Sequence, residues 1–587
     1  MATETARATP DEQRGGGMRT IARLWREATA VERAGPAYLV EEEGGWREVT
    51  WVEAARRVDE IANGLLSLGV RKGDAVAIVG STRVEWALTD FALALIGAIV
   101  APIYANSSAK DCAYILEHSE SVAAVVEDEA QREKIDGERA ALPRLERVIT
   151  FAELDEVAAS GREFAGRNPA ALEDAIAAVN EDELFTYIYT SGTTGPPKGC
   201  MIRHRNYYEM VAVVDRMESV VRPGDVMLLY LPLAHNYGRL LHLTGAYVGY
   251  TIAFCPDPLR VGDVLPAVRP TILPSVPRVF EKVYTAVRGQ FDQATGVKRT
   301  LIDWALRVGY RASRLRQRGQ ALPPGLALQH RLADRLVFSK VKKRLGGRLR
   351  VGNSGGAPLA KEIAEFFHAL DILILEGYGL TECTTAATVN RPDRFKFGTV
   401  GVPLPGVELR IAADGEILMR SETIFAGYYK NEAATREVLD EEGWLRTGDI
   451  GQLDDEGFLH ITDRKKDIIV TAGGKNVSPQ NLENALKSAP LVSQALVIGD
   501  RRPYLTALIT IDPVEAAKVP EVERRARVEA IVDGVNRDRS RYEQIKRFDI
   551  LPRDFSAEEG EITPTLKLKR RVCEQHFATE IDSLYAT

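Results

Sequence analysis

Short apolar runs alternate with helical stretches through the first half of this 587-residue chain, and this alternation limits the possible folds more than any other feature. AVAIVG (75–80) and AAVVED (123–128) have the apolar character of buried strands, whereas WVEAARRVDEIANGLLSLG (51–69) has helical spacing and ends at a glycine. Parallel strands need crossover helices of this kind. The sequence therefore predicts an α/β fold with a parallel sheet.

The chain is long enough for more than one domain, since ~150 residues per domain is the usual prior. Beyond residue 400, short stretches such as VELRI (407–411) and GEILMRS (415–421) predict a small β-rich lobe. After DRKKD (463–467), Pro479 begins a helix behind Ser478 and two strands follow, which predicts a compact α+β unit. We expect a disordered leader (1–18), an N-terminal domain (19–462), a hinge (463–467) and a C-terminal domain (468–587).

The sequence lacks the marks of export or membrane insertion. Its first residues, MATETARATPDEQRGGG, are polar and contain no apolar signal-peptide core. The longest apolar run, FALALIGAIVAPIY (91–104), suits a buried core helix better than a membrane span, which needs about 20 residues. Five scattered cysteines form no CxxC pair and indicate neither a disulfide framework nor a zinc site. We expect a cytoplasmic protein.

Charge is unevenly distributed along the chain. The net charge is −7, yet residues 278–350 carry 18 Lys or Arg and 4 Asp or Glu. This basic segment is mostly helical in pattern, with a break near PPG (323–325), and we treat about 285–345 as a helical insert. A basic segment in an acidic protein suggests a phosphate-rich cofactor, an anionic lipid or a nucleic acid as partner. The alternative is a solvated helical face.

One motif suggests a hydrolase. GNSGG (352–356) fits the GxSxG pattern of a nucleophile elbow, with a strand-like stretch before it and a helical one after. Ser354 would then need an acid and a histidine, and His368, His460 and His576 follow it in the chain. The alternative interpretation is a tight glycine turn that brings backbone close to a ligand.

Other stretches have the chemistry of a nucleotide site. YTSGTTGPPKG (189–199) is rich in hydroxyls and glycines around Lys198, but it is no P-loop, because proline precedes the lysine and glycine follows it. In EGYGLTE (376–382), Tyr378 has a ring that stacks on a flat base, and the Glu382 carboxylate suits Mg²⁺ beside a phosphate. Each stretch alone also has a purely structural explanation.

Three more polar groups extend this set. Asp449, in GWLRTGDI, is a carboxylate of the kind that accepts hydrogen bonds from ribose hydroxyls, and Arg464, in DRKKD, could pair with ribose or phosphate. Lys567 lies in EITPTLKLKRR, a stretch with little helical character, and could reach into a cleft.

In this order, the motifs resemble those of the adenylate-forming (ANL) superfamily, which includes acyl-CoA synthetases, peptide-synthetase adenylation domains and luciferases. The resemblance covers about residues 20–575 and includes GGAP (355–358) and GGKNVSP (473–479). It implies a large N-terminal domain of α/β subdomains plus the β-rich lobe, and a small, mobile α+β C-terminal domain. LPLAHNYGR (231–239), PTILPSVPRVFEKVY (270–284) and TPTLKLKRR (563–571) are similar to long-chain fatty acid–CoA ligases.

The resemblance implies a two-step reaction with ATP, Mg²⁺ and coenzyme A. A fatty carboxylate would attack the α-phosphorus of ATP to give acyl-AMP and pyrophosphate, and the CoA thiol would then displace AMP. Lys567, Thr381, Glu382 and His235 would act at the reacting groups, with Glu382 as the Mg²⁺ ligand. The implied nucleotide and CoA residues are Thr190, Ser191, Gly192, Thr193, Thr194, Lys198, Gly355, Gly356, Ala357, Glu376, Gly377, Tyr378, Gly379, Asp449, Arg464, Gly473, Gly474 and Lys475.

Some alternatives stay open. A fatty-acyl-AMP ligase would stop at the adenylate, a related ligase would take another hydrophobic acid, and an esterase would use Ser354. Asn236–Tyr237 departs from the long-chain pattern, which has an apolar residue followed by Phe, so the preferred chain length is open. The basic segment and an amphiphilic substrate suggest peripheral contact with an anionic membrane, and we expect no nucleic acid partner.

Overall fold

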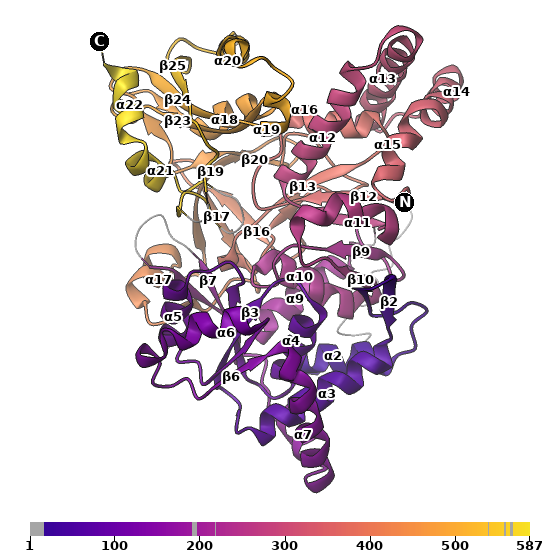
Figure 1. Ribbon diagram of the computed structural model, residues 1–587, viewed down its shortest axis with the longest axis vertical. Coiled ribbons are helices and arrows are strands. Elements are labelled where there is room, and N and C mark those ends of the chain that lie inside the picture. The colour runs from indigo at the N-terminus through magenta and orange to yellow at the C-terminus, as the bar shows by residue number, and fades with distance from the viewer. Residues whose placement is uncertain are drawn as a thin grey trace.

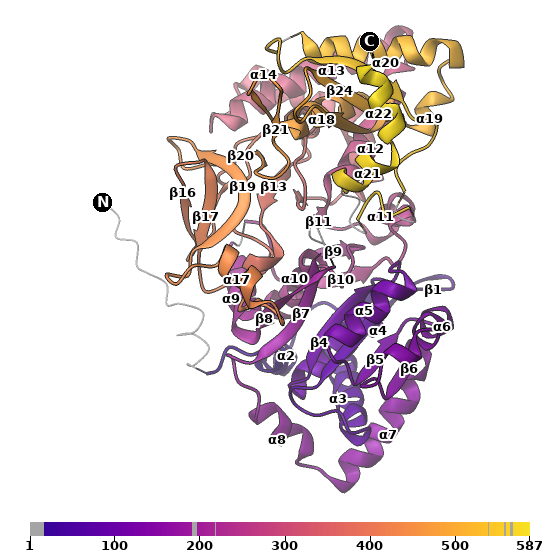
Figure 2. The same ribbon diagram turned by 90° about the vertical axis from the view of Figure 1, so that its left-hand side faces the viewer.

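The computed structural model describes residues 17–190, 196–217, 219–537, 539–556, 559–563 and 568–586. Its N-terminal strands and helices form the lower part of the molecule in Figure 1, and the C-terminal unit lies at the top beside a projecting group of helices. Figure 2 shows the β-rich lobe to one side of the space between these parts. The predicted leader lies almost wholly outside the described residues.

A seven-stranded sheet contains the predicted buried strands, in the order β18-β8-β7-β4-β3-β5-β6. From β7 to β6 neighbouring strands are parallel, whereas β8 and β18 are antiparallel additions at one edge. The strands are β3 (Ala75–Gly80), β4 (Ile99–Tyr104), β5 (Ala123–Val126), β6 (Arg147–Thr150), β7 (Leu184–Thr190), β8 (Lys198–Arg203) and β18 (Gly427–Tyr428). The associated helices are α3 (Trp51–Ser67), α4 (Val84–Leu95), α5 (Ala109–His118), α6 (Glu129–Asp136), α7 (Leu154–Arg167) and α8 (Ala171–Ala177).

The long apolar run at 91–104 is not one helix, and that prediction was wrong. Helix α4 ends at Leu95, and the chain turns at Gly97, whose φ of +68° lies in the left-handed region that glycine adopts without strain. The remainder of the run is strand β4. Both halves are buried, so apolar character alone did not distinguish helix from strand.

A second sheet has nine strands in the order β15-β14-β13-β12-β11-β9-β10-β1-β2, parallel from β13 to β1. Its strands are β1 (Tyr38–Glu42), β2 (Gly45–Val49), β9 (Val226–Leu229), β10 (Thr251–Phe254), β11 (Ile272–Ser275), β12 (Val351–Ser354), β13 (Ile374–Tyr378), β14 (Thr388–Val389) and β15 (Val402–Pro403). The associated helices are α2 (Ile21–Ala30), α9 (His204–Asp215), α10 (Asn236–Thr244), α11 (Val261–Val268) and α16 (Lys361–Ala369).

The basic segment is helical, as predicted, and its break falls at the PPG sequence. Its elements are α12 (Pro277–Asp292), α13 (Gly296–Gln317), α14 (Pro324–Ala333), the π-helical turn η5 (Asp334–Phe338) and α15 (Ser339–Arg344). Helices α13 and α14 project from the upper right of the molecule in Figure 1.

The β-rich lobe is a four-stranded antiparallel sheet of β16 (Glu408–Ile411), β17 (Glu416–Arg420), β19 (Leu445–Leu453) and β20 (Leu459–Arg464). Helix α17 (Glu432–Val438) precedes β19. The predicted hinge overlaps this sheet, because Asp463 and Arg464 are the last residues of β20. The predicted boundary at 463–467 therefore includes two strand residues.

The C-terminal unit has its own apolar core, formed by residues from Ile469 onward and separate from the main core. Its elements are β21 (Ile469–Val470), β22 (Asn476–Val477), α18 (Pro479–Lys487), β23 (Val492–Ile498), β24 (Leu505–Ile511), α19 (Pro513–Ala516), α20 (Glu521–Asn536), β25 (Ile545–Ile550), α21 (Arg570–His576) and α22 (Ala578–Tyr585). Pro479 is the first residue of α18 behind the N-cap Ser478, as predicted. Across the described part of the chain, we find no helix with the length and apolar character of a bilayer span.

Candidate active site

A cleft of about 2580 Å³ lies where the two large sheets, the β-rich lobe and the C-terminal unit meet. Strands β12 and β13 end at this cleft, and ligands of open α/β sheets bind outside such carboxyl ends. Fourteen of the predicted site residues line it. They are Thr190, Lys198, His235, Gly355, Gly356, Ala357, Glu376, Gly377, Tyr378, Gly379, Thr381, Glu382, Asp449 and Arg464.

The glycine-rich loop joins two antiparallel strands rather than a strand and a helix. Thr190 ends β7, Lys198 begins β8, and these two residues are paired in the sheet. Ser191, Gly192, Thr193 and Thr194 lie outside the described residues. In a P-loop a helix follows the lysine, whereas here the lysine begins a strand. Prolines directly before the lysine are therefore compatible with this local structure.

Tyr428 links the lysine of this loop to the predicted metal ligand. The ammonium nitrogen of Lys198 lies 4.9 Å from the centroid of the Tyr428 ring, and the Tyr428 hydroxyl donates to Oε1 of Glu382 at 2.7 Å. Tyr428 belongs to the two-residue strand β18, which is too short to be predicted from sequence. A lysine and an oriented carboxylate beside one cleft suit a phosphate and a cation.

The Glu382 carboxylate fits Mg²⁺ in its donor chemistry. Mg²⁺ prefers oxygen ligands and is commonly held by one or two carboxylates together with substrate phosphates. Among the described residues, no group of three or more His, Cys, Asp or Glu side chains forms a closed metal site. A cation at Glu382 would therefore depend on phosphate oxygens for most of its ligands.

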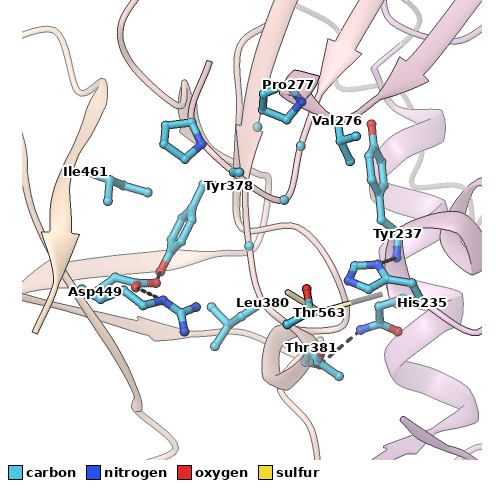
Figure 3. Close-up of a pocket in the computed structure, with 18 of the residues that line it drawn as sticks. His235, Tyr237, Val276, Pro277, Tyr378, Leu380, Thr381, Asp449, Ile461 and Thr563 are labelled. Atoms are coloured by element: carbon cyan, nitrogen blue, oxygen red, sulfur yellow. Dashed lines mark hydrogen bonds and ion pairs between the residues drawn. The ribbon is translucent and has the colours of Figure 1, made fainter. Parts of the chain in front are cut away.

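Tyr378, Asp449 and Arg464 form a hydrogen-bonded group across two sheets (Figure 3). The Tyr378 hydroxyl donates to Oδ2 of Asp449 at 2.6 Å, and Nε of Arg464 lies 3.2 Å from Oδ1. Asp449 and Arg464 face each other in the β19–β20 pair. Burial, reinforced by the Asp449 charge, raises the pKa of Tyr378, which keeps its hydroxyl a donor. The arrangement presents a fixed aromatic ring beside a carboxylate.

Glu376 lies deeper, on β13 beside Ser354 of β12. Its Oε1 accepts the backbone N–H of Leu359 at 2.8 Å. Burial raises the pKa of Glu376 to about 7, and that one hydrogen bond opposes the shift only in part. Gly356, in the neighbouring GGAP turn, has a φ of +82°, which requires glycine. Glu376 thus supports the GGAP turn, which the ANL resemblance implies to be part of the nucleotide site.

The LPLAHNYGR residues that line the cleft lie at the start of α10 and just before it. His235 is its N-cap and accepts the Tyr237 N–H through Nδ1 at 3.1 Å. Asn236 is buried and points to other protein groups: its side-chain amide donates to the Thr381 carbonyl at 3.3 Å and its carbonyl oxygen accepts from Tyr207. Asn236, where the sequence departs from the long-chain pattern, therefore holds the GLTE turn in place through its hydrogen bond to Thr381.

The cleft also has an apolar region that the sequence motifs did not reveal. Its residues come from the end of α9, the segment after it, β9, α10 and β11, so they share no sequence spacing. Most of these side chains are buried. They include Val214, Met217, Val220, Val221, Met227, Leu240, Leu241, Tyr250 and Ile272. A hydrocarbon chain suits such a lining.

Besides the four loop residues outside the described part of the chain, four predicted residues are not placed at the cleft. Gly473, Gly474 and Lys475 form the turn between β21 and β22, where Gly474 has a φ of +71°, and they do not line the cleft. The ammonium of Lys475 lies 6.0 Å from the ring centroid of Tyr542 instead. Lys567 lies outside the described residues.

The alternative hydrolase site does not assemble. Ser354 is buried, and its Oγ has no hydrogen-bond partner among the described residues. Each downstream histidine is bonded elsewhere: His368 to Ser313 at 2.9 Å, His460 to Asp454 at 3.0 Å and His576 to Glu561 at 3.1 Å. All five cysteines are buried and free. In the described part of the chain, no serine–histidine pair forms at GNSGG.

Known proteins share the whole architecture. The long-chain-fatty-acid–CoA ligase FadD15 of Mycobacterium tuberculosis is 39% identical over 587 residues, which cover 94% of this chain and 95% of that protein. The long-chain-fatty-acid–CoA ligase ACSBG2 of Xenopus laevis is 32% identical, covering 96% and 84%. The adenylation domain of a carboxylate reductase from Mycobacterium chelonae shares the fold, with a TM-score of 0.77, 24% identity and coverage of 98% and 92%.

Family models match both parts of the chain. Residues 20–429 match the AMP-binding enzyme model, and residues 466–587 match the AMP-binding enzyme C-terminal domain. The two matches leave 430–465 between them, which contains two of the four strands of the β-rich lobe and the first part of the predicted hinge. The ANL resemblance stated from the motifs is confirmed, and the chain belongs to the AMP-binding enzymes.

Proposed function

We propose that this protein activates a long-chain fatty acid with ATP and transfers the acyl group to coenzyme A. One observation supports this most: a single cleft contains both the residues predicted to bind the nucleotide and the buried apolar region described above. The two relatives described above are long-chain-fatty-acid–CoA ligases, and their activity agrees with this chemistry.

In the first step, the carboxylate and ATP are both anions, so the site must align them and offset their charge. Lys198 and the hydroxyls of its loop would hold the terminal phosphates, and Lys567 would bridge the carboxylate and the α-phosphate. Tyr378 would stack on adenine while Asp449 and Arg464 hold ribose. Thr381 would contact the α-phosphate, and His235 would lie between acyl chain and adenylate.

Mg²⁺ at Glu382 would offset the charge of the departing pyrophosphate. In this step the protein orients the Glu382 carboxylate, because the Tyr428 hydroxyl donates to Oε1 of Glu382. Glu382→Gln should raise the Mg²⁺ concentration needed for half-maximal activity, whereas the exposed Glu408→Gln should not.

In the second step, the CoA thiol attacks the acyl-AMP carbonyl and AMP leaves. No protein nucleophile is required. Because Gly473, Gly474 and Lys475 lie away from the cleft, their proposed contact with CoA would require the C-terminal unit to turn about 463–467. A ligase that stops at acyl-AMP, or one for another hydrophobic acid, remains the alternative.

ATP–pyrophosphate exchange with palmitate in the absence of CoA tests the first step. We expect wild type to exchange, Lys567→Ala to lose exchange, and the exposed Lys546→Ala to retain it. A thioester assay with CoA then tests the second step. If exchange were absent with every acid while a carboxylic ester was cleaved, the proposal would be wrong and Ser354 would become the candidate nucleophile.

A further inference from the structure

Three leucines on the projecting helices face solvent in one row. Leu328 is 70% exposed, Leu332 48% and Leu336 36%, on helix α14 and the following turn η5. Residues four apart lie on the same face of a helix. Single exposed leucines are ordinary on protein surfaces, but a row of three on one short element is a feature that needs a partner.

Cations flank this leucine row. Arg331 and Arg335 each follow a leucine by three residues, and Lys340 comes one turn later. All three are exposed, and none forms an ion pair with any described residue. The nearby acids are already engaged, since Asp334 and Asp371 both pair with Lys342, at 2.7 and 2.8 Å. The surface around the leucines is therefore positively charged.

The leucine row is not needed to hold the helices together. The opposite side of the same segment supplies the buried contacts, through Leu326, Ala333, Val337 and Phe338. Substitution of the exposed leucines should therefore leave the fold intact. Figure 1 shows α14 at the outer edge of the molecule, clear of the C-terminal unit.

The same helical segment reaches the cleft at its other end. Helix α12 begins at Pro277, and Pro277, Arg278 and Val279 line the cleft. Helices α13 and α14, which pack together as a projecting hairpin, follow α12 in the chain, so one segment of successive helices carries both the cleft wall and the leucine row. A surface bound at the hairpin would be connected to the site by this segment.

We propose that the leucine row and its flanking cations dock on an anionic lipid surface. Apolar side chains enter the boundary between headgroups and acyl chains, while Arg and Lys bury their stems and keep their charges among the headgroups. Charge complementarity favours an anionic bilayer over a neutral surface. The proposal does not rest on the ligase chemistry, because docking needs neither ATP nor acid.

Vesicle co-sedimentation of the full chain, without ATP or acid, tests this surface. We expect binding to phosphatidylglycerol-containing vesicles, weak binding to phosphatidylcholine vesicles, and a decrease with salt. Leu328→Ser/Leu332→Ser/Leu336→Ser should weaken binding by about tenfold or more. Arg331→Gln/Arg335→Gln should weaken it about thirtyfold, at about fivefold per cation. The matched control is Val522→Ser, which removes a 91% exposed valine from the C-terminal unit.

An unchanged midpoint of urea unfolding would show that each variant is folded, and it separates this test from that of the ligase proposal. Binding unchanged in both row variants would overturn the lipid assignment. So would equal binding to neutral and anionic vesicles, or a wild-type dimer that the leucine variants convert to monomer, since the row would then join two copies of the chain.

Discussion

The hydroxyl of Tyr378 and Oδ2 of Asp449 are 2.6 Å apart, and this hydrogen bond joins the nine-stranded sheet to the four-stranded sheet of the β-rich lobe. Asp449 is buried and also pairs with Arg464 at 3.2 Å. One carboxylate thus fixes an aromatic ring and a guanidinium from two different strands. The positions of these groups depend on each other.

Asp449→Asn should weaken nucleotide binding. The amide oxygen can still accept from Tyr378, but the ion pair with Arg464 is lost and the ribose loses its charged acceptor. Hydrogen bonds to charged groups contribute roughly 1.5–3 kcal/mol, so we expect the KM for ATP in pyrophosphate exchange to rise about 10- to 100-fold. Glu408→Gln, an exposed carboxylate paired with Arg420, is the control and should change KM little. An unchanged KM in Asp449→Asn would contradict the ribose assignment.

Glu376 should make stability depend on pH. Its pKa is raised to about 7 by burial, whereas the unfolded chain releases this proton near 4.5. Between these values the native state binds more protons than the unfolded state, so this group's contribution to the free energy of unfolding falls as pH rises from about 4.5 to 7.

Glu376→Gln removes that decline while keeping an acceptor for the Leu359 N–H. The variant should match wild type near pH 4.5 and be more stable by about 3 kcal/mol above pH 7.5. Urea unfolding across pH, without nucleotide, measures this difference. Parallel pH profiles for the two proteins would show that Glu376 ionises normally.

Val221→Phe should shift the substrate preference toward acids with shorter hydrocarbon chains. Val221 is buried and lines the apolar region of the cleft, so a larger ring would occupy space otherwise open to a hydrocarbon chain. Each methylene that loses its place costs roughly 1–3 kcal/mol in discrimination. We expect kcat/KM for palmitate to fall at least tenfold relative to octanoate. Val514→Phe, at a 66% exposed position, controls for added bulk and should leave the ratio unchanged.

The fully buried pair of Asp90 and Arg239 should be essential for stability. Nε of Arg239 lies 3.0 Å from Asp90, a second guanidinium nitrogen also bonds the carboxylate, and a third donates to Thr186 at 2.6 Å. Arg239→Met leaves Asp90 buried without its charge partner and should cost about 3–5 kcal/mol.

Asp90→Leu combined with Arg239→Met removes both charges and should recover more than half of that loss. Tryptophan fluorescence during urea unfolding reports on this region, because the ring centroid of Trp86 lies 5.6 Å from Cζ of Arg239. A double variant no more stable than Arg239→Met would show that hydrogen bonds to the pair, rather than its charge balance, dominate.

Local sequence signals predicted most of the fold and the nucleotide-type residues. Strand β3 and helix α3 lie where apolar runs and helical spacing placed them, because both signals are local. The run at 91–104 failed because helix and strand are equally apolar there, and only the turn at Gly97 separates them.

The parts of the site that were missed are produced by tertiary packing. Met217, Met227 and Ile272 meet in one apolar region although they come from separate elements with no common motif. Tyr428 reaches Glu382 from a two-residue strand that forms only by pairing with β8. The sequence shows that Asn236 departs from the long-chain pattern, but the hydrogen bond of its side chain to Thr381 could not be inferred from the sequence.

The two halves of the cleft are built largely by different elements: the apolar region by α9, α10, β9 and β11, and most residues predicted to bind the nucleotide by β7, β8, β12, β13, β19, β20 and the segments after β12 and β13. They meet at Asn236, whose side-chain amide donates to the Thr381 carbonyl at 3.3 Å, and at Tyr237, whose ring would lie 3.0 Å from a Cβ placed on Gly355. The chain can therefore exchange one acid for another during evolution, or by design, through changes that never touch the nucleotide side. Asn236 and Tyr237 limit such changes, because a substitution at either position would alter both the apolar side and the nucleotide side of the cleft.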